Sequence, residues 1–544
     1  MSNAFDKASL VMLPHAYEDG KVYSLKPTDR SGDFTFSRGS DTATRVGEDG
    51  YIKKETSNLL LQSNQFDTTW TRTRTSVTSG QNGYDGSSDA WLLECNEGPA
   101  NVSLQQSLSS SSVVTYSVYA KAGTTNWLNI RTQASGDSVW FDLANGVIGT
   151  QKPTTIASKI ESVGNDWYRL SIVFDSCTAV RFYVVDGNNN FAVTLGASVY
   201  IQDAQLNQGL VAQDYLETTT APVYGGLTDN MPRLDYSGGA TCPSLLLEPS
   251  RTNLIPYSEY YEGSSYVLET NATLDSTLYE SPEGVNNAYK LNLPSIISRI
   301  THAVQYNGAH TFSVWMKADT SGTISLRCAT GNPAVSEQKN VTTEWQKFDI
   351  TATDANYWQV IRNSGDTLSS VYIYGHQIEQ GPYPTSYIPT YGSSQTRAFE
   401  VNGLGLSPVL SDNYSVFAEV TRITETFINN GEFIDYRSSS DTNDRLRMYN
   451  YNNGRIRFRL YYNDGTNNSF FSNSGDWAKG DTIKFCFTYN NGNIFIYANG
   501  EQLHSISQTL NNLNSVNIEQ EKFKQLLHFD FTLTEQEAIA LTTL

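Results

Sequence analysis

Five aromatic residues on strand-like stretches have the chemistry to bind sugar rings. An aromatic side chain offers a flat apolar face that stacks on a pyranose, while nearby Asp, Asn, Gln or Arg side chains bind its hydroxyl groups. The candidates occur in two repeated regions and are Trp127, Trp140, Tyr183, Tyr357 and Trp358. Each could instead pack in a core or at a subunit interface. We take the five as candidate glycan-binding residues.

The sequence gives weaker evidence for catalytic residues than for sugar-binding ones. Glycoside hydrolysis uses two carboxyl groups that flank the scissile bond. The nearest pair on a predicted strand is Glu432 and Asp435, and a spacing of three residues places them on opposite faces of a regular strand. The six histidines lack metal-ligand spacing, and we find neither a nucleophile elbow nor a phosphate-binding loop. The sequence therefore predicts a protein that is not an enzyme and needs no cofactor.

Metal and thiol chemistry are also sparse. Calcium prefers carboxylate and amide oxygens, and Asp441, Asn463 and Asp464 are the residues that could supply them, so the question of a metal site stays open. The five cysteines are widely separated and show no CxxC spacing. Cys328 and Cys486 lie in apolar strand-like patterns, which predicts buried free thiols. Folding in a reducing cytosol fits this cysteine usage.

The charge balance disfavours two classes of partner. The formal net charge is −19, and we find no run of Lys and Arg that would offset it locally. Phosphate contacts need such a basic footprint, so nucleic-acid binding and binding to an anionic membrane are disfavoured. The apolar run at residues 8–13 is shorter than a signal-peptide core, and no stretch approaches the ~20 apolar residues of a spanning helix. We expect synthesis in the cytoplasm without a signal peptide and no membrane insertion.

Two copies of one pattern organise the chain. The pentapeptide at residues 205–209 (QLNQG) precedes Tyr215, and that at residues 377–381 (QIEQG) precedes Tyr387 at the same interval. Further matches between the copies are residues 58–63 with 253–258, 116–122 with 312–318, and 166–170 with 344–348. Repetition at this length indicates two related domains in series. Trp167 and its counterpart Trp345 are predicted to pack in the cores.

The elements expected around these motifs are short strands. Many segments alternate apolar with polar residues, as a strand with one wet face requires, and helical periodicity is nearly absent. We predict an all-β chain of tandem antiparallel sandwiches, with one short helix capped by Thr534 and Glu537. The expected divisions are a leader at 1–55, module 1 at 56–225, a linker at 226–250, module 2 at 251–392 and a C-terminal domain at 393–544. The leader is too small to hold a core alone and is expected to pack on module 1 or on a partner.

The motifs resemble known families. The C-terminal hairpin at residues 487–500 and the segment at 529–537 resemble concanavalin A-like and laminin-G-like domains, and the repeated modules look like carbohydrate-binding jelly rolls. The leader segment at 33–40, the segment at 246–254 and the end of module 2 at 387–390 are similar to tailed-bacteriophage virion proteins such as tail fibres, head fibres and spikes.

This resemblance implies a structural virion protein that assembles with other virion proteins and attaches to host-surface glycans. It implies a homo-oligomer, a trimer by analogy with phage fibres, located in the virion after synthesis in the host cytoplasm. Tail and head locations both stay open. The alternatives are a purely architectural protein that decorates the capsid or tail, and a glycan depolymerase.

Overall fold

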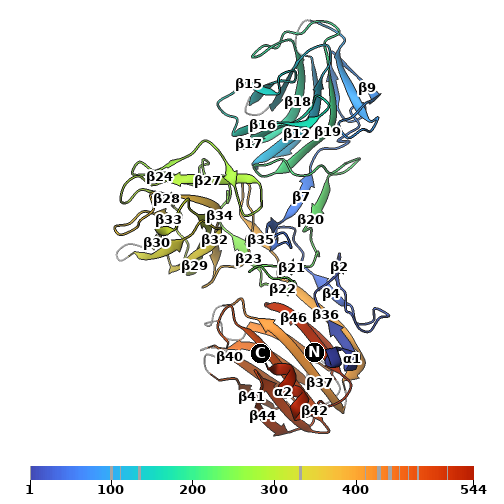
Figure 1. Cartoon of the computed structure of the whole chain (residues 1–544), viewed down its shortest axis with the longest axis vertical. Helices are drawn as coiled ribbons and strands as arrows, with labels where there is room; N and C mark the ends of the chain where they lie inside the picture. The colour runs from blue at the N-terminus through green and yellow to red at the C-terminus, as the bar shows by residue number, and fades with distance from the viewer. Residues whose placement is uncertain are drawn as a thin grey trace.

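Three bodies of β-structure make up the molecule (Figure 1). The structure is a computed structural model that describes residues 2–98, 102–110, 112–132, 137–329, 334–410, 412–424, 431–438, 444–451, 454–462, 465–473, 477–510 and 513–543. Nearly all regular structure in these residues is antiparallel strand. The predicted class of tandem antiparallel sandwiches is confirmed.

Module 1 is a sandwich of two six-stranded sheets. Their strand orders are β16-β17-β12-β19-β10-β9 and β15-β14-β13-β18-β11-β8. Side chains from both sheets, among them Tyr116, Leu128 and Phe182, form one buried core. The strands are β8 (Thr71–Thr73), β9 (Thr75–Gln81), β10 (Ala90–Cys95), β11 (Ser103–Ser110), β12 (Val114–Ala122), β13 (Trp127–Thr132), β14 (Ser138–Asp142), β15 (Val147–Gln151), β16 (Ala157–Gly164), β17 (Trp167–Phe174), β18 (Cys177–Val185) and β19 (Ser198–Gln208).

Module 2 repeats this arrangement. Its sheets have the orders β25-β27-β34-β29-β32, with β26 beside β27, and β24-β28-β33-β30-β31. The long strand β34 lies between β29 and β27, as β19 lies between β12 and β10 in module 1. The strands are β24 (Val267–Glu269), β25 (Thr273–Leu274), β26 (Tyr279–Glu280), β27 (Asn286–Asn292), β28 (Arg299–His302), β29 (Ala309–Lys317), β30 (Gly322–Ala329), β31 (Val335–Val341), β32 (Gln346–Thr353), β33 (Tyr357–Ile361) and β34 (Ser370–Gln380).

The recurring motif residues tie the start of each module to its last strand. In module 2, Nδ2 of Asn253 donates to the carbonyl oxygen of Ile388 at 2.9 Å, and Oε1 of Gln377 accepts from the N–H of Ile388 at 2.7 Å. Asn58 and Gln205 hold the equivalent positions in module 1. All four side chains are buried. Because a buried amide must find partners for both its oxygen and its NH₂ group, these residue types recur at fixed spacing.

The C-terminal sandwich includes the beginning of the chain. One sheet has the order β21-β22-β46-β37-β42-β43-β44, with β1 also paired to β46, and the other β2-β3-β4-β36-β45-β38-β39-β40-β41. The strands from the N-terminal half are β1 (Leu10–Met12), β2 (Tyr17–Glu18), β3 (Lys21–Val22), β4 (Phe34–Ser37), β21 (Leu234–Asp235) and β22 (Ser244–Leu246). The others are β36 (Val401–Leu410), β37 (Asn413–Thr421), β38 (Gly431–Arg437), β39 (Arg445–Tyr451), β40 (Arg455–Tyr461), β41 (Asn467–Phe471), β42 (Thr482–Asn490), β43 (Asn493–Ala498), β44 (Glu501–Ser507), β45 (Leu513–Glu519) and β46 (Lys522–Phe529).

This pairing changes the place of the leader and the linker. The sequence sets residues 1–55 apart as a docking segment on module 1 or on a partner, whereas β1 to β4 are strands of the C-terminal sandwich. Residues 226–250 contribute β21 and β22 to the same body and are more than a linker. Short ribbons complete the connections: β5 (Arg45–Val46) with β6 (Ile52–Lys53), β7 (Glu55–Asn58) with β20 (Val223–Gly226), and β23 (Arg251–Asn253) with β35 (Gln395–Arg397).

Two short helices lie on the C-terminal sandwich, α1 (Ser2–Lys7) and α2 (Glu535–Thr542). The predicted capping box is confirmed, because Thr534 accepts from the N–H of Glu537 and Glu537 accepts from the N–H of Thr534. Neither helix in the described part of the chain is long and apolar enough to span a membrane.

The five cysteines are free thiols, and the buried positions predicted for Cys328 and Cys486 are confirmed. Trp167 is buried, whereas Trp345 is partly exposed.

The core of module 2 encloses a histidine. His376 is 2% exposed, and its ring lies 4.6 Å from that of Tyr261, 5.4 Å from that of Tyr266 and 5.2 Å from that of Phe312, measured between centroids. Burial disfavours the imidazolium and lowers the pKa of His376 to about 3, from an ordinary value of 6.5. The unfolded chain therefore binds a proton below pH 6.5 that the folded chain does not.

We expect His376→Phe to reduce the acid sensitivity of the fold. Between pH 6.5 and about pH 4.5 the wild type loses stability through this histidine, by about 2 kcal/mol more than the variant loses. Denaturant unfolding of both proteins at the two pH values measures the difference. Replacement of the exposed His15 by Phe serves as the control and should leave the pH dependence unchanged. An identical pH dependence of His376→Phe and wild type would contradict the expectation.

Candidate functional site

Three of the five predicted sugar-binding aromatics are covered. Trp140, Tyr183 and Trp358 are 1%, 6% and 1% exposed, and Trp358 belongs to the core of module 2. Trp140 lies outside the module 1 core, but its Nε1 donates to the carbonyl oxygen of Asn190 at 3.1 Å and Phe191 packs against it and Tyr183. These three therefore cannot act as open platforms, which corrects the expectation. Strand alternation shows which face a side chain takes but not whether a loop covers that face.

Tyr357 is partly exposed at the start of β33 in module 2. The guanidinium of Arg327 lies 5.6 Å from the centre of its ring. The next outward residue on the strand, Gln359, donates through Nε2 to the hydroxyl of Thr301 at 3.0 Å. An Arg on one ring face leaves less of that face for a sugar, so Tyr357 is a weaker platform than its sequence context indicates.

Trp127 does line a cavity. It begins β13 and borders a cavity of about 490 Å³ at one end of module 1. The remaining lining residues are Thr124, Thr125, Asn126, Asp186, Thr194, Leu195, Gly196 and Ala197. Oγ1 of Thr194 donates to Oδ2 of Asp186 at 2.7 Å, and Leu195 is 66% exposed at the rim. The cavity thus combines an indole, a carboxylate, an amide and hydroxyl groups, which are the groups that bind pyranoses.

An aromatic cluster supports Trp127 from behind. The cluster consists of Trp127, Trp140, Tyr183, Val185 and Phe191, and it lies on the outer face of the module 1 sheet that contains β13, β14 and β18. Trp127 and Val185 occupy paired positions on β13 and β18. Because Trp140, Tyr183 and Val185 are buried, the indole of Trp127 is held in place before any ligand arrives.

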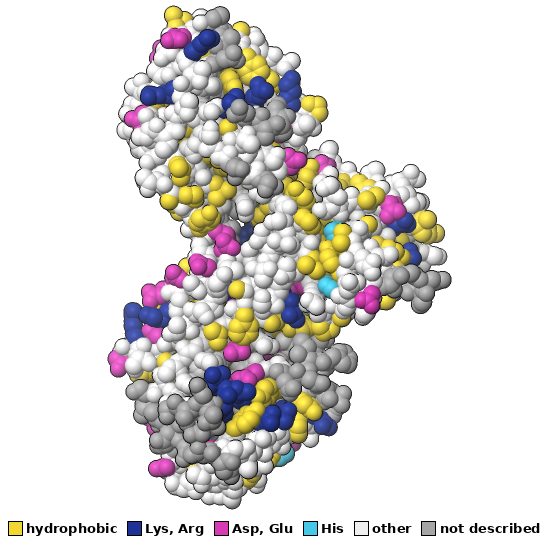
Figure 2. Space-filling model, turned by 180° about the vertical axis from the view of Figure 1, so that it is seen from behind, with side chains coloured by type: hydrophobic (Ala, Val, Ile, Leu, Met, Phe, Trp, Pro, Cys, Tyr) yellow, Lys and Arg dark blue, Asp and Glu magenta, His cyan; other side chains and the backbone are white. Residues whose placement is uncertain are grey.

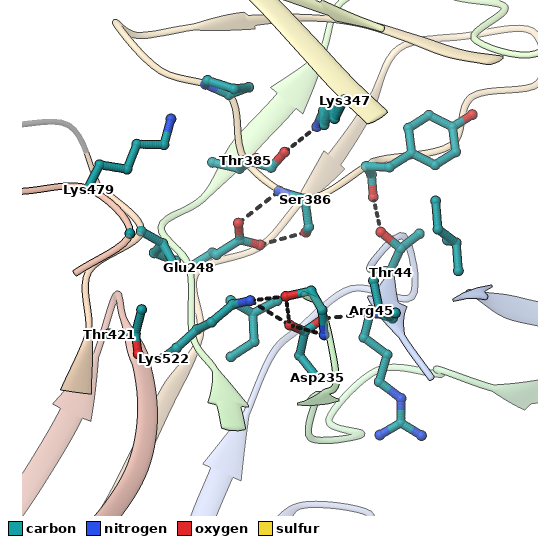
Figure 3. A pocket seen from close by; sticks show the side chains of 18 of the residues that line it. Thr44, Arg45, Asp235, Glu248, Lys347, Thr385, Ser386, Thr421, Lys479 and Lys522 are labelled. Carbon is teal, nitrogen blue, oxygen red and sulfur yellow. Dashed lines mark hydrogen bonds and ion pairs between the residues drawn. The ribbon is translucent and has the colours of Figure 1, made fainter. Parts of the chain in front are cut away.

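A second cavity lies where module 2, the connectors and the C-terminal sandwich meet (Figure 3). This junction pocket has a volume of about 500 Å³. Module 2 contributes Trp315 and Lys347, while the sandwich contributes Lys479 and Lys522. Figure 3 shows Lys522 directed toward Asp235, and the Nζ to Oδ2 distance is 2.6 Å.

The junction pocket has both cationic and apolar walls. Nζ of Lys347 donates to the carbonyl oxygen of Thr385 at 2.6 Å, and burial lowers the pKa of Lys347 despite the nearby Glu379. The partly buried indole of Trp315 has an Nε1–H without a hydrogen-bond partner in the described chain. The pocket can therefore take a small ligand that offers hydrogen-bond acceptors to these donors.

Beneath this pocket is a buried ion network of five residues, the junction ion network: Arg38, Arg233, Glu248, Arg397 and Glu400. Oε1 of Glu400 accepts from Nη1 of Arg38 at 3.0 Å and from Nε of Arg233 at 2.8 Å. Glu248 binds Arg233 at 2.8 Å and Arg397 at 3.0 Å. Each member is 4% exposed or less. Burial opposes ionisation of Glu248, but Arg397 and Arg233 outweigh it and hold its pKa far below the ordinary value. The network joins the residue after β4, the residues that flank β21 and β22, and the segment from β35 to β36.

The C-terminal sandwich presents a surface that the sequence reading missed. Its nine-stranded sheet carries on its outer side the arginine–tyrosine face, which consists of Arg437, Arg445, Arg447, Tyr449, Tyr451, Arg455, Arg457, Arg459, Tyr461 and Phe471. Their neighbours along each strand, such as Leu446 and Phe458, are in the core. Seen from behind in Figure 2, Lys and Arg side chains gather beside hydrophobic ones on this body. The Arg and Tyr residues that alternate with apolar residues along β39 and β40 could have revealed this face in the sequence.

Two carboxyl groups on this face depart from the sequence expectation. A β-bulge between Glu432 and Ile434 shifts the register, so that Glu432 pairs with Tyr449 and Asp435 with Arg447 on the same face of the sheet. Burial, together with the charge of Asp435, raises the pKa of Glu432 to about 7. Burial also opposes the ionisation of Asp435, but its arginine partners outweigh it and lower its pKa.

Sequence comparisons give no family. No family model and no curated protein matches the chain. Among solved structures, the binding domain of botulinum neurotoxin serotype D is 15% identical over 26% of this chain and 40% of its own, with a TM-score of 0.23. A SAP-like pentraxin from Limulus polyphemus is 17% identical over 25% of this chain and 72% of its own, with a TM-score of 0.20. The CBM40 domain of a Ruminococcus gnavus sialidase is 14% identical over 25% and 84%, with a TM-score of 0.21. This chain thus spans less than half of the toxin domain.

Metal binding has little support in the described part of the chain. No group of three or more His, Cys, Asp and Glu side chains with suitable geometry occurs there. Asp441, Asn463 and Asp464, the residues with calcium-type oxygens, lie outside the described residues. The described cavities instead combine aromatic rings, amides, hydroxyls and charges, which suits reversible binding of polar ligands.

Proposed function

We propose that this chain is a glycan-binding attachment protein and that the Trp127 cavity is its sugar site. The observation that carries the proposal is that Trp127 borders one cavity with Asp186, Asn126 and Thr194. The indole supplies an apolar face for a sugar ring, and the carboxylate and amide bind its hydroxyls. A single such site is weak, so several copies on one particle would raise the avidity.

The finer assignment is to the virion of a tailed phage, as a tail fibre, head fibre or spike. It rests on the sequence motifs of the leader and connectors given above. In this role the chain forms a homo-oligomer, with a trimer as the expected state, and assembles with other virion proteins. The alternative of a purely architectural decoration protein predicts no glycan binding at all.

Hydrolysis is the less favoured chemistry. A single guanidinium, that of Arg447, binds both candidate carboxyls, at 3.3 Å from Glu432 and 3.2 Å from Asp435. A retaining glycosidase holds its carboxyl groups about 5–5.5 Å apart, with the reacting sugar carbon between them. Arg437, Arg445 and Arg447 also bind Asp435. These contacts favour binding over catalysis by this pair.

Glycan-array and host-cell binding by the full chain test the proposal. We expect Trp127→Ala to weaken binding at least tenfold, because it removes the stacking surface. Asp186→Asn keeps the volume and shape of the cavity and should weaken binding severalfold. Tyr224→Ala, which removes an aromatic that is 51% exposed elsewhere in the chain, is the matched control. Binding that survives both cavity variants would refute this site, and release of reducing ends from host glycans would favour the depolymerase.

A further inference from the structure

The arginine–tyrosine face concentrates positive charge on an acidic protein. The chain has 37 Lys and Arg against 56 Asp and Glu, yet six arginines project from three neighbouring strands of one sheet face. Cross-strand pairs place Arg447 opposite Arg459 and Arg437 opposite Arg445. Like charges directly opposite each other destabilise a sheet, and Asp435 offsets this repulsion for the arginines of β38 and β39.

Aromatic rings hold these guanidinium groups in place. Arg457 lies 6.0, 5.8 and 5.8 Å from the ring centres of Tyr449, Tyr451 and Phe471. Arg459 lies 4.6 Å from the ring centre of Tyr461. Arg457 also donates through Nε and Nη2 to Oγ of Ser469 at 3.2 and 2.9 Å, and Arg459 donates through Nε to Oδ1 of Asn467 at 3.2 Å. A guanidinium that is already stacked and hydrogen-bonded loses little conformational freedom when it binds an anion.

The acids on the described part of this face lie toward one end. Asp435, whose side chain is 1% exposed, binds Arg437, Arg445 and Arg447. Glu432 is beside it, and Glu519 lies two positions along β45 from Asn517, the partner of Asp435. Burial raises the pKa of Glu519. Arg455, Arg457 and Arg459 on β40 are on the opposite side of β39 from these acids.

We propose that the arginine–tyrosine face binds an acidic polysaccharide, a chain of sugars that carry carboxylates. Arginine matches the two oxygens of a carboxylate with two N–H donors. The tyrosine rings give apolar area for the sugar rings between the charges. Asn467 and Ser469 on β41 pair with Tyr461 and Arg459, and their side chains orient Arg459 and Arg457 on the same face. This proposal extends the proposed glycan attachment to a second surface and depends on it for its biological setting.

Charge complementarity favours this occupant over nucleic acid. Duplex DNA carries one charge per ~1.7 Å, and a binding protein needs a long basic footprint to neutralise it. Here the basic face is short and the rest of the chain carries a net negative charge. A polyuronate has one carboxylate per sugar and neutral hydroxyls between them, which fits alternating arginines and tyrosines better.

Binding of the full chain to immobilised alginate tests the proposal, with neutral dextran and single-stranded DNA as comparison probes. We expect saturable binding to alginate, none to dextran, and weakening as salt screens the charges. The triple variant Arg455→Gln/Arg457→Gln/Arg459→Gln should bind alginate at least tenfold more weakly. The control Arg72→Gln/Lys121→Gln/Lys159→Gln removes three cations from module 1 and should bind like the wild type.

Three outcomes would overturn the proposal. The first is equal alginate binding by the triple variant and the wild type, and the second is tighter binding to the DNA than to alginate. The third is that the wild type does not bind alginate but forms an oligomer that the triple variant loses. The last outcome would make the face a contact between copies of this chain. Trp127→Ala should retain alginate binding, so failure of the Trp127 site and failure of this face are separate results.

Discussion

Glu400→Gln is expected to lower the apparent free energy of unfolding of the C-terminal sandwich by about 3–5 kcal/mol. The Glu400 carboxylate is fully buried and accepts hydrogen bonds from Arg38, Arg233 and the backbone N–H of Glu248. Gln removes the charge and turns an NH₂ group toward groups that are all donors. Three buried guanidinium groups, those of Arg38, Arg233 and Arg397, would then share one carboxylate.

Hydrogen exchange separates this effect from general destabilisation. We expect faster exchange in β21, β22 and β4, which meet at the junction ion network, and unchanged exchange in module 1. Glu161→Gln is the matched control, because Glu161 pairs with Lys159 at an exposed site where the side chains are 46% and 58% exposed. An exposed pair contributes less than about 1 kcal/mol. A Glu400→Gln protein as stable as this control would contradict the expected role of the network.

Phe34→Ala is the second change with a large expected effect. Phe34 is fully buried in β4, and its ring belongs to the core of the C-terminal sandwich. Truncating a buried Phe costs about 3–5 kcal/mol through lost burial and the cavity left behind. We therefore expect a substitution near the start of the chain to destabilise a body formed mainly by residues 393–544.

Thr35→Ala provides the control on the same strand. Thr35 points outward and is exposed, so its replacement should change the free energy of unfolding by less than about 0.5 kcal/mol. Hydrogen exchange should quicken in β36 and β45 of the Phe34 variant and remain slow in β12 and β19 of module 1. Faster exchange in module 1 instead would support packing of the leader on module 1.

By the same argument, a fragment that begins at residue 393 should fold poorly, since it lacks β1 to β4, β21 and β22.

The local patterns of the sequence determine much of this protein. Strand alternation sets the all-β class, the QLNQG and QIEQG pentapeptides mark two modules with one strand order, and Thr534 with Glu537 marks α2. These features rest on interactions between residues that are close in the chain, or on side-chain types that recur because a buried amide needs the same partners twice.

Tertiary structure alone decided the rest, because the deciding contacts join distant residues. Pairing of β4 with β36 and of β1 with β46 assigns the leader to the C-terminal sandwich, and strands of two to four residues give no sign of such partners. The loop that carries Asn190 and Phe191 covers Trp140, while Trp127 stays open at the end of the same face. The bulge beside Glu432 turns it to the side of Asp435. A sequence shows which side chains a strand can present, whereas packing decides which remain accessible and which charges meet.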